Sequence, residues 1–126
     1  MPALIAIAIG GALGAVSRYA IASAIYAWLG RGFPTGTLVV NVLGSLLMGF
    51  LWVAMAERLD ANSALRAGLT VGLLGAFTTF STFSLETLAL MQNGEFAKAG
   101  LNVALSVVLC ILGCALGMML ARVTFA

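Results

Sequence analysis

The sequence predicts an all-α integral membrane protein with four transmembrane helices, which together form a single membrane domain over residues 1–126. Its composition is 63% hydrophobic and only 8% charged, whereas a soluble domain carries about 25% charged residues. Four apolar runs have the roughly 20 residues needed to cross a bilayer, and they occupy 3–29, 35–56, 65–91 and 97–121. The connections between these runs contain glycine, proline, asparagine and aspartate, together with five of the ten charged residues, so we expect short turns between antiparallel neighbours.

The first run, 3–29, contains one charged residue, Arg18. A cleaved signal peptide is an alternative reading, but the run lacks a basic lead-in and exceeds the roughly 7–15 residue core of such peptides. We therefore expect a retained helix. Arg18 lies about 22 Å along it at 1.5 Å per residue. Its side chain either extends to the far interface or supplies a fixed positive charge that attracts anions into an aqueous vestibule.

Polar residues on the second and fourth runs recur every four positions, which places each set on one helical face. The two sets are Thr37, Asn41 and Ser45, and Asn102, Ser106 and Cys110. Polar groups are costly inside a bilayer and tend to mark functional sites. Either set alone is explained equally well by hydrogen bonds that join helices. Two such sets in so apolar a chain favour a hydrophilic track.

The third run contains five hydroxyl residues within the seven positions 78–84. Serine and threonine side chains compete with helical hydrogen bonds, and Gly75 adds backbone freedom beside them. We therefore expect this helix to break near the membrane midplane and to expose carbonyl groups, which indicates ion binding. The alternative is an intact helix whose hydroxyls bond to the preceding turn.

Phe80 and Phe83 are three residues apart and share a helical face with Glu86 after the expected break. Aromatic residues in a membrane segment ordinarily contact lipid or pack in the core. The edge of an aromatic ring, however, carries partial positive charge. Beside a polar track, two ring edges would contact an anion without the full charge that would trap it.

The chain contains no histidine, which excludes the usual catalytic triads and histidine-ligated metals. We therefore expect no enzyme. We also expect no nucleic-acid partner. Cys110 and Cys114 are one turn apart, but no further cysteine or histidine would complete a soft-metal site. They are expected to be small packing residues.

The charges in the connections favour neither orientation strongly. Arg58, Arg66 and Arg122 fall on the side of the N-terminus, and Arg31 and Lys98 on the other. A balance of three against two predicts dual topology, in which opposed copies form an antiparallel homodimer. The alternative is a parallel oligomer with a slight preference for one orientation.

Glycines four residues apart predict close contacts between helices, as in other membrane proteins. The pairs are Gly10 and Gly14, Gly68 and Gly72, and Gly113 and Gly117. They indicate packing and carry no chemistry.

Three motifs together resemble the Fluc (CrcB) family of fluoride channels. They are the Gly-Ala-Leu-Gly-Ala-Val-Ser-Arg pattern that ends at Arg18, the Asn-Val-Leu-Gly-Ser run of 41–45, and the run of 75–83. The resemblance covers the whole chain. It implies a passive fluoride channel in the bacterial inner membrane that lowers cytoplasmic fluoride, with two pores in each antiparallel homodimer.

The resemblance also implies roles for individual residues. The pore would be lined by Phe80, Phe83, Asn41, Thr37, Ser106, Thr82, Ser81 and Glu86, and Arg18 would be the vestibule arginine. One structural Na⁺ would be held at the dimer centre by the backbone carbonyls of Gly75 and Thr78 from both subunits. A hydroxyl at position 110 would extend the track, and Cys110 is a weaker donor.

A proton-coupled exporter of the small multidrug-resistance type is the alternative function, because it has the same size and number of helices. It requires an acidic residue in the first span, where Arg18 is the only charge. A third class, a membrane subunit without transport activity, would leave the polar tracks without a purpose.

Overall fold

The computed structural model describes residues 1–57 and 62–126, and all regular structure in these two ranges is helical. Arg58, one of the charges counted for orientation, lies outside them. Four helical runs are long and apolar enough to cross a membrane: Pro2–Leu29, Thr35–Glu57, Ser63–Gln92 and Phe96–Thr124. The four predicted spans are confirmed. The largest difference at any end is at the last one, where the helix extends to Thr124 rather than to 121.

Helix α1 (Pro2–Leu29) starts with proline in its first turn, where the absent N–H is tolerated. It ends at Gly30, whose φ of 77° suits glycine and whose N–H donates to the Tyr26 carbonyl at 2.8 Å. Helix α2 (Thr35–Glu57) begins after the short 30–34 connection.

The third span consists of four segments. Helix α3 (Ser63–Ala67) is capped by Asn62, whose side chain accepts from the Leu65 N–H at 2.8 Å. A π-helix, η1 (Gly68–Leu74), and a short α4 (Gly75–Phe77) follow. After an interruption at 78–79, α5 (Phe80–Gln92) completes the span.

The interruption consists of two residues with extended backbone. Thr78 has φ −91° and ψ 156°, and Thr79 has φ −150° and ψ 117°. Thr79 also caps α5, because its Oγ1 accepts from the Thr82 N–H at 3.1 Å. A turn with Gly94 at φ 78° then leads into α6 (Phe96–Thr124).

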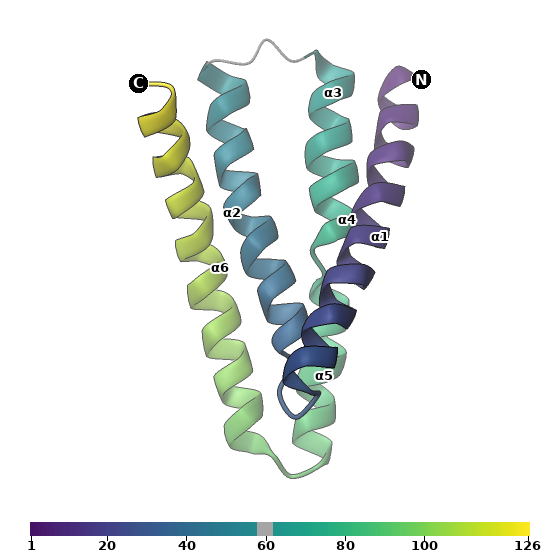
Figure 1. Cartoon of the computed structure of the whole chain (residues 1–126), viewed down its shortest axis with the longest axis vertical. Helices are drawn as coiled ribbons and strands as arrows, with labels where there is room; N and C mark the ends of the chain where they lie inside the picture. Colours follow the sequence, from purple (N-terminus) through teal and green to yellow (C-terminus); the bar gives the residue numbers. More distant parts are fainter. Residues whose placement is uncertain (58–61) are drawn as a thin grey trace.

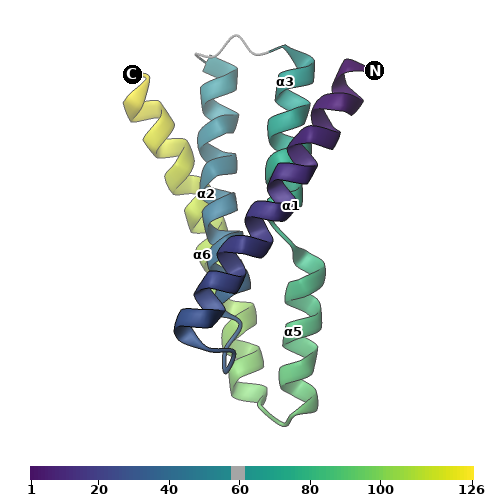
Figure 2. The ribbon, with the colours of Figure 1, turned by 45° about the vertical axis from the view of Figure 1, so that its right-hand side comes forward.

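The helices form two closely packed pairs, α1 with η1 and α2 with α6. Both termini, the end of α2 and the start of α3 lie at one end of the molecule, and the α1–α2 and α5–α6 connections lie at the other (Figure 1). The two pairs diverge toward the end that carries the termini. Figure 2 shows α1 crossing the bundle obliquely and α5 displaced sideways from the axis of α3 at the interruption.

Glycines bring the backbones of each pair into contact. A Cβ atom at Gly14 would lie 2.1 Å from the Leu73 carbonyl oxygen, and one at Gly10 would lie 2.2 Å from that of Gly68. In the second pair, a Cβ at Gly117 would lie 2.0 Å from the Leu46 carbonyl oxygen. The predicted packing role of these glycines is confirmed.

Candidate functional site

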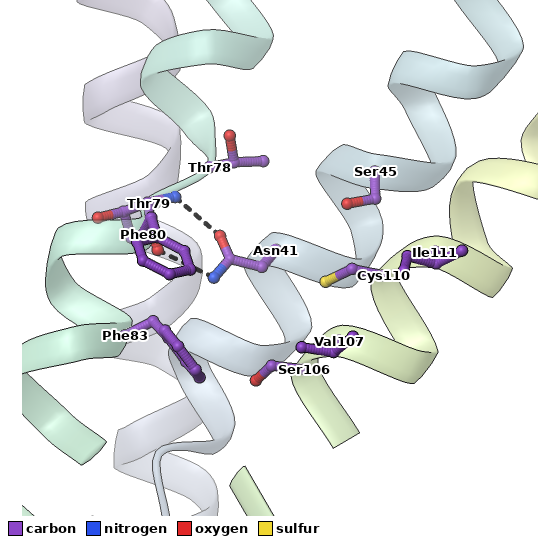
Figure 3. A pocket seen from close by; sticks show the side chains of 10 residues that line it. All are labelled: Asn41, Ser45, Thr78, Thr79, Phe80, Phe83, Ser106, Val107, Cys110 and Ile111. Carbon is purple, nitrogen blue, oxygen red and sulfur yellow. Dashed lines mark hydrogen bonds between the residues drawn. The ribbon is translucent and has the colours of Figure 1, made fainter. Parts of the chain in front are cut away.

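Asn41 on α2 holds the interruption of the third span. Its Oδ1 accepts from the Thr79 N–H at 2.8 Å, and its Nδ2 donates to the Thr79 carbonyl at 3.0 Å (Figure 3). A primary amide carries two N–H donors and two acceptor lone pairs. One N–H of Asn41 therefore remains for a ligand.

The interruption frees backbone carbonyls from their helical donors. In a regular helix the Thr79 N–H would donate to Gly75, but here it donates to Asn41. The Thr82 N–H would donate to Thr78, but here it donates to the Thr79 hydroxyl. The carbonyls of Gly75 and Thr78 are the two that the resemblance assigns to sodium.

Arg18 lies beside the same interruption. Its Nε donates to the Ala76 carbonyl at 3.0 Å, at the end of α4. A positive charge is favourable next to the carbonyls that end a helix. The guanidinium group thus contacts the third span directly beside the interruption.

A pocket of about 350 Å³, which we call the phenylalanine pocket, opens between α2, α5 and α6 (Figure 3). The two rings that line it lie with centroids 5.2 Å apart and planes tilted by 43°. Phe83 is buried, whereas Phe80 is 78% exposed on the single chain. The lining residues are Asn41, Ser45, Thr78, Thr79, Phe80, Phe83, Ser106, Val107, Cys110 and Ile111.

Ser106 begins a chain of polar contacts that leaves this pocket along α6. Its hydroxyl donates to Asn102 Oδ1 at 3.4 Å, and Asn102 Nδ2 donates to Thr87 Oγ1 at 2.9 Å. Thr87 donates in turn to the Phe83 carbonyl at 2.7 Å. Sequence reasoning missed Thr87, although a threonine four residues after Phe83 has the spacing for this backbone bond.

A second pocket of about 190 Å³, the arginine pocket, lies on the other side of Thr79. Its lining includes Arg18, Tyr26, Arg31, Thr37, Thr79, Thr82 and Glu86. The predicted site residues are therefore divided between two pockets, with Thr79 lining both. Along α2, Asn41 and Ser45 line the phenylalanine pocket, whereas Thr37 lines the arginine pocket.

Glu86 accepts one hydroxyl on each carboxylate oxygen. Thr37 Oγ1 donates to Oε1 at 2.5 Å, and the Tyr26 hydroxyl donates to Oε2 at 2.6 Å. The Thr37 N–H completes the group by donating to the Tyr26 oxygen at 3.3 Å. Sequence reasoning missed Tyr26.

Ser81, the remaining predicted pore residue, is exposed and pairs with the Thr79 hydroxyl at 3.2 Å. In residues 1–57 and 62–126 no group of three or more cysteine, aspartate or glutamate side chains has the placement for a metal site.

The chain matches a known protein family over most of its length. The profile of the family described as "CrcB-like protein, Camphor Resistance (CrcB)" matches residues 5–118. A "Fluoride-specific ion channel FluC" from Magnetococcus marinus is 56% identical over 92% of this chain and 94% of its own length. One from Geobacter sulfurreducens is 51% identical over 97% of this chain and 98% of its own.

A protein of the same description from Methylococcus capsulatus is 57% identical over 94% of this chain. The match covers 52% of that relative, so the chain spans about half of its length. The family profile and these relatives cover nearly all of the four-helix bundle, including the interruption, and on this evidence the chain belongs to the CrcB-like family.

Proposed function

We propose that this protein is a fluoride-selective passive ion channel of the bacterial inner membrane that lowers cytoplasmic fluoride. Membership of the CrcB-like family and the fluoride channels among its relatives support this function. The phenylalanine pocket is the structural observation that carries it. Its lining combines hydrogen-bond donors and two aromatic rings, and includes no charged side chain among the described residues.

The lining suits a small, strongly hydrated anion. Such an ion leaves water only when donors replace its hydration shell. The second amide N–H of Asn41, the hydroxyl of Ser106 and the edges of Phe80 and Phe83 supply such donors. A lysine or arginine there would bind the anion tightly and slow its release, because conduction needs weak sites. We assign Arg18 to the approach, where a positive charge raises the local anion concentration.

The functional unit in this proposal is an antiparallel homodimer with two pores, and the interruption lies near the membrane midplane. On the single chain Phe80 and Gly75 are exposed next to the interruption. A second, inverted copy would cover them and would complete the wall of each phenylalanine pocket. The near-balance of charge between the two ends of the helices permits both orientations.

A structural Na⁺ fits the carbonyls of Gly75 and Thr78. Na⁺ is a hard cation that takes oxygen ligands, and these two carbonyls have lost their helical donors to Asn41 and to the Thr79 hydroxyl. Two subunits would supply four such oxygens at the dimer centre. When bound, the ion would neutralise the carbonyl dipoles of both interruptions and hold the subunits together.

A proton-coupled exporter is less well supported than a channel. Such an exporter needs an acidic residue in its first span, and Arg18 is the only charged residue of α1. Membership of the CrcB-like family and the similarity to proteins named as fluoride channels also favour a channel.

Efflux from liposomes tests the channel. We expect purified protein to release fluoride rapidly and chloride slowly, without a proton gradient, as followed by ion-selective electrodes. Phe80→Ile and Phe83→Ile should each lower fluoride release without dissociating the dimer. Phe96→Ile is the matched control, because Phe96 is exposed at the start of α6 and outside both pockets. Unchanged release in both pocket variants would contradict the role of the rings.

A further inference from the structure

A third pocket of about 290 Å³ lies toward the α5–α6 turn, and we call it the outer pocket. Its lining includes Tyr26, Arg31, Glu86, Asn93, Glu95 and Lys98. Tyr26, Arg31 and Glu86 line both this pocket and the arginine pocket. These three side chains therefore form the wall between a pocket at the end of the bundle and one at the interruption.

Glu86 places a carboxylate in this wall, and cationic side chains line the pockets on both sides of it: Arg18 and Arg31 in the arginine pocket, and Arg31 and Lys98 in the outer pocket. A like charge within a few ångströms repels an anion strongly where water is scarce. Whether Glu86 obstructs the passage therefore depends on its side-chain conformation. In the structure the carboxylate is held by two hydroxyls, one from Thr37 and one from Tyr26.

The ring of Tyr26 is fixed on two sides. On one side it contacts the backbone of Gly36, where a Cβ atom would lie 2.6 Å from the ring carbon Cε2. On the other, the Arg31 guanidinium carbon lies 4.5 Å from the ring centroid, in a cation–π contact. Tyr26 is only 8% exposed. The ring that presents the hydroxyl to Glu86 is therefore buried and packed on two faces.

We infer that Tyr26 is a positioning residue that holds the Glu86 carboxylate against α1 and α2, out of the path between the outer pocket and the arginine pocket. This inference rests on the proposed anion conduction. Because Glu86 takes its second hydroxyl from Thr37, loss of Tyr26 leaves the carboxylate attached at one oxygen only. It is then free to turn into the passage.

Tyr26→Phe removes the hydroxyl and keeps the ring, so the packing against Gly36 and Arg31 remains. A hydrogen bond to a charged group biases an equilibrium by roughly 10- to 100-fold, and we expect fluoride release from liposomes to fall by about threefold or more. Tyr19→Phe is the matched control, because Tyr19 also lines the arginine pocket but is not one of the two hydroxyl donors to Glu86. It removes the other phenol of the chain, from the same helix, at a position that is 75% exposed.

A double-mutant comparison separates this role from a packing defect. In a Glu86→Gln background the side chain has no charge to repel an anion, so adding Tyr26→Phe should change fluoride release by less than about 1.5-fold. The same proportional loss in both backgrounds would contradict the inference, because the effect would then not pass through the carboxylate.

Infrared spectroscopy gives a second measurement that does not depend on conduction. The carboxylate band assigned to Glu86 by its absence in Glu86→Gln should shift in Tyr26→Phe and stay in place in Tyr19→Phe. An unshifted band, or release by Tyr26→Phe equal to that of the wild type, would overturn the role of Tyr26 alone. A wild type that released no fluoride would contradict the proposed function, and this inference with it.

Discussion

At the residue scale, one amide stabilises the interruption of the third span. Backbone N–H and carbonyl groups away from water need hydrogen-bond partners, and an interrupted helix leaves several without them. Asn41 supplies both an acceptor and a donor to Thr79. The residue that holds the interruption thus also lines the phenylalanine pocket.

Asn41→Ala should destabilise the protein, because it leaves both backbone groups of Thr79 without their partner. The expected cost is about 1–3 kcal/mol for each group left unsatisfied. Thermal unfolding in detergent would measure it. Asn93→Ala is the control, since Asn93 is exposed in the α5–α6 turn and its side chain makes no hydrogen bond within the described residues. Equal melting temperatures for the two variants would count against the role of Asn41.

The four-residue spacing of polar residues indicates that Asn41 belongs to a site, but it does not indicate that Thr79 is its hydrogen-bond partner. The contact with Thr79 depends on the extended backbone at 78–79, and no residue pattern specifies that geometry. Tyr26 was missed for a related reason. An aromatic residue near the end of a membrane span is typical of the lipid interface, and its contact with Glu86 joins positions 60 residues apart in the chain.

At the element scale, the π-helix η1 lies where α1 approaches most closely. Its widened turn is visible in the Gly75 N–H, which donates to the Thr70 carbonyl five residues earlier. Gly68 and Gly72 face α1 across the contact. The glycine spacing predicts this contact. The π geometry is not predictable, because the residues of 68–74 suit an α-helix equally well.

Gly14→Ala and Gly11→Ala should change stability in opposite directions. A Cβ at Gly14 meets the Leu73 backbone, which cannot yield cheaply, so we expect a loss of about 1–3 kcal/mol. A Cβ at Gly11 meets nothing within 4 Å. There alanine should stabilise α1 by up to about 1 kcal/mol. Denaturant titration of helicity would show whether the signs differ, and a similar loss in both would contradict the contact.

At the scale of the whole molecule, the face that carries Gly75 and Phe80 remains uncovered in a single chain. The four spans were predictable from hydropathy, since a long apolar run has few alternatives to a membrane helix. The division of the polar residues between two pockets was not. Thr37 and Asn41 share a helical stripe, yet they line different pockets. Thr79, the residue before α5, lines both pockets.

Removing sodium should weaken the proposed dimer. For one bound ion, each tenfold reduction in Na⁺ above its dissociation constant lowers the stability of the complex by about 1.4 kcal/mol. Chemical cross-linking in detergent, with choline replacing Na⁺, would follow dissociation. A third sample with K⁺ at equal ionic strength distinguishes a specific effect of Na⁺ on the dimer from general screening of charge. A dimer equally stable in all three media would exclude the central ion.

Added charge should control orientation. Two lysines inserted in the α5–α6 turn should make that end cytoplasmic, and two inserted beside Asn62 should make the opposite end cytoplasmic. Reporter tags at both termini would show the orientation. Either variant alone should lose fluoride release, and co-expression of both should restore it. Full release by one variant inserted in a single orientation would contradict the antiparallel dimer.

The glycine contacts between helices also set the order of assembly during synthesis. Neither closely packed pair joins neighbours in the chain: α1 packs on η1 of the third span, and α2 packs on α6. The packing of α1 on η1 must therefore wait until the third span has entered the membrane. The packing of α2 on α6 must wait until α6 has left the ribosome. In this contact Gly49 of α2 meets the backbone of Cys114, and Leu46 of α2 meets Gly117. A nascent chain stalled before α6 would leave the close-packing face of α2 without its partner.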